Sequence, residues 1–204
     1  MENNISDATL GRLFRYYKYL CEQRDSGQTR TSSAAIGEAL GLTASQVRQD
    51  FNALGCFGHQ GYGYQINQLI EELRDIAKLD RQKSAVIIGA GALGRAVASN
   101  LNFGSYGFHL VALFDSRQSV TGQIIRDLPV RHLSDLDEFC RDNKVQAAII
   151  CQPSGAAALA HQLGKAGVKG IWNLGGGFVE DIDGVEILNL DLQESLLRLS
   201  FLME

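Results

Sequence analysis

The chain has 204 residues, of which 45% are hydrophobic and 21% charged, and its formal net charge is −4. This composition is typical of a globular protein with a core large enough for one or two domains. The negative charge argues against coating of nucleic acid by bulk charge, and no apolar run approaches the roughly 18 residues that span a bilayer, so we expect no membrane partner.

The first eighty residues are predicted to be mostly helical. Apolar residues recur at helical spacing in "ATLGRLFRYYKYL", near the N-terminus. A second helix is expected from near Ser33 to Gly41, and a third from about Thr43 to Leu54. The glycine-rich "CFGHQGYGYQI" suits a tight hairpin, and a fourth helix follows, for which Asn67 is the expected cap.

This order of elements predicts a winged helix-turn-helix, because "GLTAS" makes a short turn between two short helices and a hairpin follows. The third helix would enter the major groove, with Val47, Phe51 and Leu54 facing the core. Arginine prefers guanine, whereas glutamine and asparagine prefer adenine. The residues expected at DNA are Ser45, Gln46, Arg48, Gln49 and Asn52 in the helix, and His59, Gln60, Gly61, Tyr62 and Gly63 in the wing.

The charge of this segment leaves an alternative open. Residues 1–66 contain six basic and six acidic residues. Phosphate contacts usually come from an excess of lysine and arginine. A helical protein-interaction domain is therefore the second interpretation of this segment.

From Lys83 onward, short apolar strands alternate with helices, which predicts an α/β fold with a parallel sheet covered on both faces. Strands are expected at 85–89, 108–115, 146–151, 170–173 and 185–190, and helices at 91–100, 134–143 and 154–166. The polar link "KLDRQK" suggests a boundary between a winged-helix domain (1–80) and a Rossmann-like domain (81–189), and a C-terminal helix (190–204) is expected to follow.

The segment Gly89-Ala90-Gly91-Ala92-Leu93-Gly94 lies between a predicted strand and a predicted helix, as in a dinucleotide-binding turn. The free N–H groups at the helix start would attract phosphate. Asp115 follows Gly94 by 21 residues, where an acid would accept hydrogen bonds from ribose hydroxyls and repel the extra phosphate of NADP. Arg117 weakens that second inference. A coenzyme A domain, or a glycine-rich turn without a ligand, are the alternatives.

No catalytic or metal site is indicated. A dehydrogenase needs a proton donor or base near the nicotinamide, and none of the four histidines lies in an obvious motif. The four cysteines are scattered without Cys-x-x-Cys spacing, so we expect neither a metal site nor a disulfide framework. With no export signal at the N-terminus, a reducing cytoplasm is the expected location. Binding of NAD(H) by a sensor is favoured over an enzyme.

Taken together, "SQVRQDFNALGCFGHQGYGY", "GAGALG", "GVKGIWN" and "LNLDL" occur in the order and spacing of the Rex redox-sensing repressors, which the chain resembles from about Ala8 to Leu202. The resemblance implies a homodimer that binds operator DNA when NADH is scarce and releases it when NADH binds. It also implies that the last helix, with its stripe of Leu192, Leu196, Leu197 and Leu199, is exchanged between subunits. The alternative for this segment is a terminal core helix.

The resemblance extends to individual residues. It implies that Lys18 and Asp191 pair between subunits in one state, and we expect Gln152, Pro153 and Asn173 to join the cofactor site. The chain departs from the family pattern at Gln49 and Asn52 in the third helix, and at the basic positions of the wing, which carry His59 and Gln60. "NLGGGFVEDIDG" replaces a segment that usually lines the nicotinamide. A Rex-like NAD(H)-binding protein that acts through protein partners therefore stays open as a second hypothesis.

Overall fold

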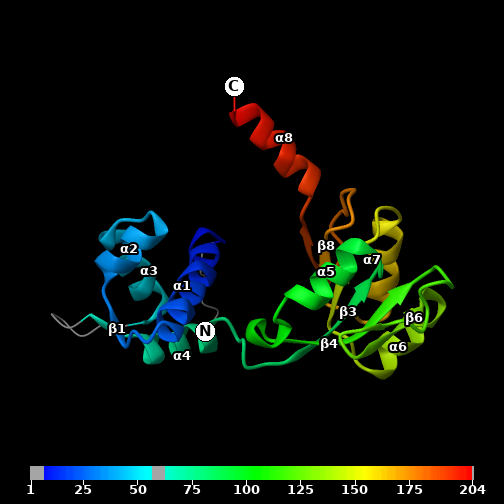
Figure 1. Ribbon diagram of the computed structural model, residues 1–204, viewed down its shortest axis with the longest axis horizontal. Coiled ribbons are helices and arrows are strands. Elements are labelled where there is room, and N and C mark those ends of the chain that lie inside the picture. Colours follow the sequence, from blue (N-terminus) through cyan, green and yellow to red (C-terminus); the bar gives the residue numbers. More distant parts are fainter. Residues whose placement is uncertain (1–6, 57–62, 204) are drawn as a thin grey trace. The chain divides into compact units, whose positions relative to one another are not determined.

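The computed structural model describes residues 7–56 and 63–203, and the chain divides into two compact units, Met1–Asp80 and Arg81–Glu204 (Figure 1). Within the described residues, no helix is both long and apolar enough to cross a membrane. Each unit has its own hydrophobic core.

The first unit is a helical cluster with a small antiparallel sheet. Its elements are α1 (Asp7–Asp25), β1 (Arg30–Thr31), α2 (Ser33–Leu40), α3 (Ala44–Leu54), β2 (Tyr64–Gln65) and α4 (Ile66–Ile76). Ser32 caps α2 through Ala35 N, and Thr43 caps α3 through Gln46 N, as serine and threonine favour helix starts. The predicted cap of the fourth helix is wrong: α4 begins one residue before Asn67, and the capping position belongs to Gln65.

The core of this unit fixes the orientation of α3. Val47 and Phe51 are fully buried and Leu54 nearly so, which confirms the inward face expected from helical spacing. Phe51 packs edge-on between Tyr16 and Tyr64, with both ring centroids 5.0 Å away. Because these contacts come from α1 and β2, α3 cannot rotate without disrupting the core, and its opposite face stays exposed.

The second unit is built on a sheet of order β5-β6-β4-β3-β7-β8-β9. Its strands are β3 (Lys83–Ile88), β4 (Phe108–Asp115), β5 (Ile124–Ile125), β6 (Leu128–His132), β7 (Ala147–Ile150), β8 (Gly170–Asn173) and β9 (Glu186–Asn189). All neighbouring strands in the spatial order β6-β4-β3-β7-β8-β9 pair in parallel, as expected for alternating strands and helices. This arrangement brings the carboxyl ends of β3, β4 and β7 to one edge.

The edge hairpin β5–β6 is antiparallel and was not expected from the sequence. Arg126 and Asp127 both take positive φ, as the central residues of a primed hairpin turn do. Glycine and asparagine usually mark such turns. Their absence here, together with strands of two and five residues, explains why the sequence pattern does not reveal the hairpin.

Helices cover the two faces of the sheet unequally. On one face, α6 (Leu136–Asp142) and α7 (Ala156–Lys165) pack against residues such as Val86 and Ile88. On the other, α5 (Ala92–Asn100) and the 3-10 turn Phe103–Tyr106 pack against Ala85 and Ile87. This second cover does not extend across β8 and β9. There, Trp172 and Leu188 line an open, apolar groove of about 700 Å³, so the expected full coverage is wrong at this end.

The last element is α8 (Leu192–Leu202), coloured red in Figure 1. No described residue of this helix is buried. Its exposed apolar side chains, together with the residue that follows it, are Leu192, Leu196, Leu197, Leu199, Phe201, Leu202 and Met203, each more than half exposed. The alternative of a terminal core helix is therefore wrong for this chain on its own.

Candidate functional site

The glycine-rich loop joins β3 to α5 and is shaped by two close approaches. Gly89 has φ +101°, and a Cβ there would lie 2.9 Å from Gln152 N. A Cβ on Gly94 would overlap the carbonyl oxygen of Gly89 and lie 3.3 Å from Ile87 Cγ2. These positions therefore need glycine for the turn and for packing of helix on strand, in the roles expected from the spacing.

Gly91 is different, because the space over it is open. A Cβ there would meet only the Nη2 atom of Arg117, at 3.7 Å, among the described residues. Gly91 is also the capping residue of α5, and no described side chain caps the helix. The first N–H groups of α5 are thus available to an anion, and the loop leaves room for one.

Asp115, at the carboxyl end of β4, is almost fully buried beside this loop. Its Oδ2 accepts hydrogen bonds from Ala90 N at 2.9 Å and from Arg117 Nη2 at 2.8 Å. Its Oδ1 accepts from the backbone N and the Nε of Arg117, both at 2.9 Å. The hydrogen bonds from Arg117, then that from Ala90, outweigh burial and lower the pKa of Asp115 to about 2, so it is ionised at neutral pH.

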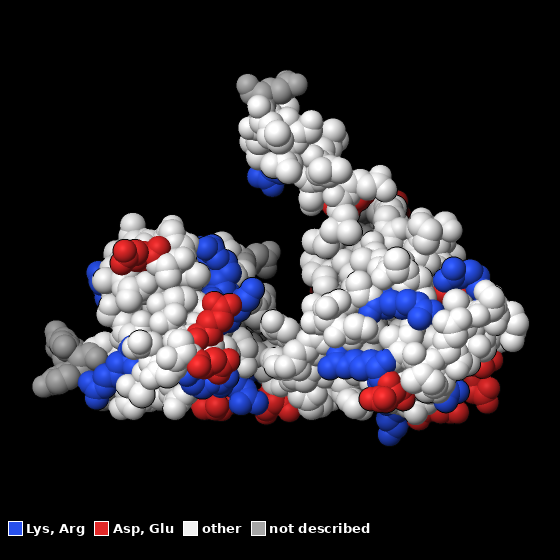
Figure 2. Space-filling view, in the orientation of Figure 1, with Lys and Arg blue, Asp and Glu red and all other residues white. Residues whose placement is uncertain are grey.

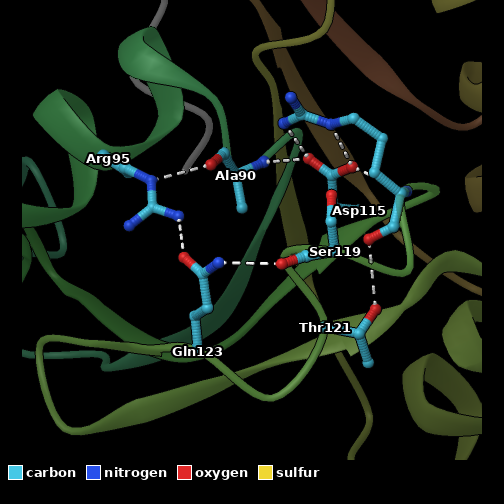
Figure 3. Close-up of polar contacts among 7 residues, drawn as sticks. Ala90, Arg95, Asp115, Ser119, Thr121 and Gln123 are labelled. Atoms are coloured by element: carbon cyan, nitrogen blue, oxygen red, sulfur yellow. Dashed lines mark hydrogen bonds and ion pairs between the residues drawn. The ribbon is translucent and has the colours of Figure 1, made fainter.

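A second set of polar contacts holds the loop after β4 against α5 (Figure 3). Arg95 Nε donates to the Ala90 carbonyl at 3.0 Å, and Arg95 Nη2 donates to Gln123 Oε1. Gln123 Nε2 donates to the Ser119 carbonyl at 2.9 Å. Sequence reasoning missed Arg95 and Gln123, because their pairing depends on a loop whose conformation no motif specifies.

The other residues expected at the cofactor fall into two groups. Gln152 and Pro153 follow β7, and Gln152 lies directly beside Gly89, so the structure brings this segment to the loop. Asn173 is only 2% exposed. Its Nδ2 donates to the Gly177 carbonyl and to Asn189 Oδ1, and its Oδ1 accepts from Gly175 N. Asn173 therefore holds the loop after β8, and its place in the cofactor site stays a prediction.

The exposed face of α3 carries Ser45, Arg48, Gln49 and Asn52. They lie at helical positions i, i+3, i+4 and i+7, so they form one continuous polar surface. Arg48 Nη1 donates to Ser33 Oγ at 3.1 Å, which rests the guanidinium against the start of α2. Gln46 differs from the expectation, because its Nε2 donates inward to Asp50 Oδ1 at 2.9 Å.

Asp50 anchors α3 to α1. It is 3% exposed and accepts hydrogen bonds from Arg12 Nε at 2.6 Å and Tyr16 Oη at 2.6 Å, in addition to that from Gln46. Burial alone would raise the pKa of Asp50, but these donors together lower it below its ordinary value. No role for Asp50 was expected from the sequence, since two of its partners, Arg12 and Tyr16, lie more than thirty residues away.

Charge on the first unit is mixed. Figure 2 shows lysine and arginine side chains interspersed with aspartate and glutamate on the visible face.

The wing residues His59, Gln60, Gly61 and Tyr62 lie outside the described residues, whereas Gly63 leads into β2. Lys18 is exposed on α1, and Asp191 caps α8 by accepting from Gln193 N at 2.7 Å. In residues 7–56 and 63–203, no group of three or more His, Cys, Asp or Glu is arranged to hold a metal.

Comparisons with known families divide the chain as the structure does. Residues 4–52 match the family described as "Putative DNA-binding protein N-terminus". Residues 80–177 match the family described as "CoA binding domain". The first match covers α1, α2 and most of α3, and the second covers the sheet from β3 to β8 together with the glycine-rich loop.

Relatives cover the whole chain. The "Redox-sensing transcriptional repressor Rex" of Clostridium novyi is 42% identical to this chain, over 99% of this chain and 97% of the relative. The protein of the same name from Clostridium acetobutylicum is 41% identical, over 100% of this chain and 95% of the relative. Two solved structures cover 98% of this chain at 38% identity. One is "RSP, a Rex-family repressor", with TM-score 0.85 over 95% of that chain. The other is RSP "in complex with beta-NAD+ and operator DNA", with TM-score 0.90 over 92% of that chain.

Proposed function

The chain belongs to the Rex family of redox-sensing transcriptional repressors, and from this premise we propose that it binds operator DNA through α3 and releases it when NADH binds beside the glycine-rich loop. One observation carries the proposal. The chain aligns with Rex repressors over its full length, and it has both an exposed polar face on α3 and a glycine-rich loop whose free N–H groups can bind an anion. Relatives that align with the whole chain are named transcriptional repressors, and we infer that the activity of this chain is binding.

The DNA-reading surface follows from the exposed face of α3. Arg48 would contact guanine, and Gln49 and Asn52 would contact adenine, from a helix lying in the major groove. The Asp50 anchor keeps this face outward by fixing α3 on α1. Because residues 1–66 contain six basic and six acidic residues, we expect base contacts to contribute a larger share of the affinity than in a domain with an excess of lysine and arginine.

The nucleotide site fits NAD(H). The open space over Gly91 and the uncapped start of α5 suit the pyrophosphate, and Asp115 stands at the strand end where ribose hydroxyls bind. The same phosphate-binding features would suit coenzyme A, but the buried, ionised Asp115 favours a ligand with a free ribose diol over one with a ribose phosphate. The nicotinamide, when bound, supplies the redox signal, and the protein's part is to hold the adenosine and pyrophosphate.

We also propose a homodimer that α8 holds together. The exposed apolar side chains of this helix would cost solvation energy in an isolated chain. The groove beside Trp172 and Leu188 lies on the same unit and is also apolar. Burying such surfaces between two copies would place two recognition helices on one palindrome, with half-sites about one helical turn or a small multiple apart.

A gel shift separates this proposal from the protein-partner alternative. The full-length dimer is incubated at low salt with a Rex-type palindromic duplex, and with a scrambled duplex of equal length and composition. A retarded band on the palindrome alone is expected. Equal retardation of both duplexes, or of neither, would contradict operator recognition and favour action through protein partners.

A further inference from the structure

The carboxylate of Asp115 has no vacant acceptor position among the described residues. A carboxylate has about four lone-pair sites. Each oxygen of Asp115 already accepts two hydrogen bonds, one from a backbone N–H and one from the side chain of Arg117. Ribose hydroxyls can donate to Asp115 only when one of these donors leaves.

The side chain of Arg117 is the donor that can leave. The amides of Ala90 and Arg117 are fixed by the backbone, and Ala90 is fully buried. The Arg117 side chain is 56% exposed, whereas that of Asp115 is 5% exposed. Because the guanidinium is the more exposed partner, it can leave the pair and be hydrated, and the ribose hydroxyls can then replace its two hydrogen bonds to the buried carboxylate.

The displaced guanidinium stays at the nucleotide. In the structure its Nη2 lies 3.7 Å from the position that a Cβ on Gly91 would take. The guanidinium therefore lies between Asp115 and the open space over the glycine-rich loop. The Arg117 backbone remains bonded to Asp115 Oδ1, which limits how far the side chain can travel. A guanidinium held there can pair with a phosphate on the adenosine ribose, because its planar fork matches phosphate oxygens.

We propose that Arg117 is a specificity-determining residue of the nucleotide site: it competes with the ribose of NAD(H) for Asp115, and it supplies the cation that pairs with the 2′-phosphate of NADP(H). This inference rests on the proposed function. Arg117 thereby narrows the preference for NADH that Asp115 creates. Removal of the Arg117 side chain should raise the affinity for NADH, because Asp115 is then free to accept hydrogen bonds from the ribose hydroxyls. It should lower the affinity for NADPH, because the negative charge of Asp115 then repels the 2′-phosphate with no cation beside it.

The test is calorimetric titration of the full-length protein with NADH and with NADPH. Arg117→Ala is expected to bind NADH roughly threefold more tightly, as loss of a partly exposed competitor implies. It is expected to bind NADPH at least roughly tenfold more weakly, as loss of a hydrogen bond to a charged group implies. Arg117→Gln, which keeps a long polar side chain without charge, should show the same loss for NADPH. The control Arg141→Ala removes an exposed cation on α6 and should change neither affinity.

The outcomes separate the two claims. If Arg117→Ala leaves both affinities unchanged or moves them in the same direction, the role of Arg117 is wrong while the proposed function stands. If Arg141→Ala also tightens NADH binding and weakens NADPH binding, the net charge of the protein rather than the position of Arg117 is responsible. The proposed role of Arg117 is then wrong as well. If neither the wild type nor Arg117→Ala binds NADH, the proposed function itself is contradicted.

Discussion

The Asp50 carboxylate on α3 and the Tyr16 hydroxyl on α1 are joined by a buried hydrogen bond of 2.6 Å. Arg12 donates to the same carboxylate from one turn earlier on α1. One acid therefore fixes the recognition helix from its inner side, and the residues on the outer side remain free to contact a partner. Loss of this acid should affect both the stability of the first unit and the position of its DNA-reading face.

Replacing Asp50 by asparagine should lower the free energy of unfolding by about 1–3 kcal/mol, because Arg12 and Tyr16 lose a charged acceptor. The measurement is urea unfolding of the full chain, followed by circular dichroism. Asp25→Asn is the matched control, since Asp25 forms an exposed pair with Arg24 and should cost much less. A similar loss in both variants would contradict the anchoring role of Asp50.

The same acid predicts a pH dependence. The pKa of Asp50 is lowered on folding, so the unfolded chain binds more protons below about pH 4. The stabilisation is therefore fully present above about pH 4 and is lost as pH falls through the folded-state pKa. Between about pH 5 and pH 3, Asp50→Asn should lose less stability than the wild type. Parallel pH profiles for the two proteins would show that Asp50 does not titrate as expected.

Arg48→Ala should remove a base contact of roughly 1–3 kcal/mol per half-site, which would bring specific binding close to background across two half-sites. Gln49→Lys should have the opposite effect, because it adds a cation to the same face and should steepen the salt dependence by about one phosphate contact per subunit. Anisotropy titrations of a labelled operator over a salt series measure both. Wild-type affinity in Arg48→Ala would show that α3 does not read the operator.

Two glycines of the loop should respond differently to a side chain. Gly91→Val should fold, because its backbone is extended and the space above it is open, but it should lose NADH binding by filling the position of the pyrophosphate. Gly94→Ala should instead destabilise the second unit, because its Cβ would overlap the Gly89 carbonyl. Melting curves and NADH calorimetry distinguish the two effects. Wild-type NADH affinity in a folded Gly91→Val protein would place the ligand elsewhere.

The C-terminal helix should determine the oligomeric state. Leu196→Asp, or deletion from Asp191 onward, should convert dimer to monomer or aggregate, because each removes or disrupts the apolar surface of α8. Gln193→Asp adds the same charge at the start of the helix without removing an apolar side chain, so it should remain dimeric. Light scattering reports the mass. An unchanged dimer after the deletion would show that α8 does not hold the subunits together.

The sequence was sufficient wherever a local pattern determines the structure. Helical spacing identified the inward face of α3, and the glycine spacing located the turn between β3 and α5. It was insufficient where the determinant is a distant partner. Nothing in the sequence indicated that Asp50 accepts hydrogen bonds from Arg12 and Tyr16 on α1. Arg117 was recognised as a neighbour of Asp115, but its hydrogen bonds to both carboxylate oxygens were not expected.

The hairpin β5–β6 and the loop after β8 illustrate a second limit. Arg126 and Asp127 adopt a turn that their residue types do not favour, because β5 pairs with β6 while β6 pairs with β4, and these pairings impose the turn. Asn173, the last residue of β8, was expected to join the cofactor site. Its amide instead bonds to Asn189 and to the backbone of its own loop, a pairing between neighbouring strands that no single segment encodes.

The central claim is that nucleotide binding in the second unit releases DNA from the first. The most direct measurement is the anisotropy of a labelled palindromic operator, bound to the full-length protein, as NADH or NAD+ is added at constant salt. The account predicts that NADH lowers the anisotropy to that of free DNA, that NAD+ at the same concentration does not, and that Gly91→Val stays bound with either. If NADH leaves the wild-type complex intact at concentrations that saturate its site by calorimetry, the account is contradicted.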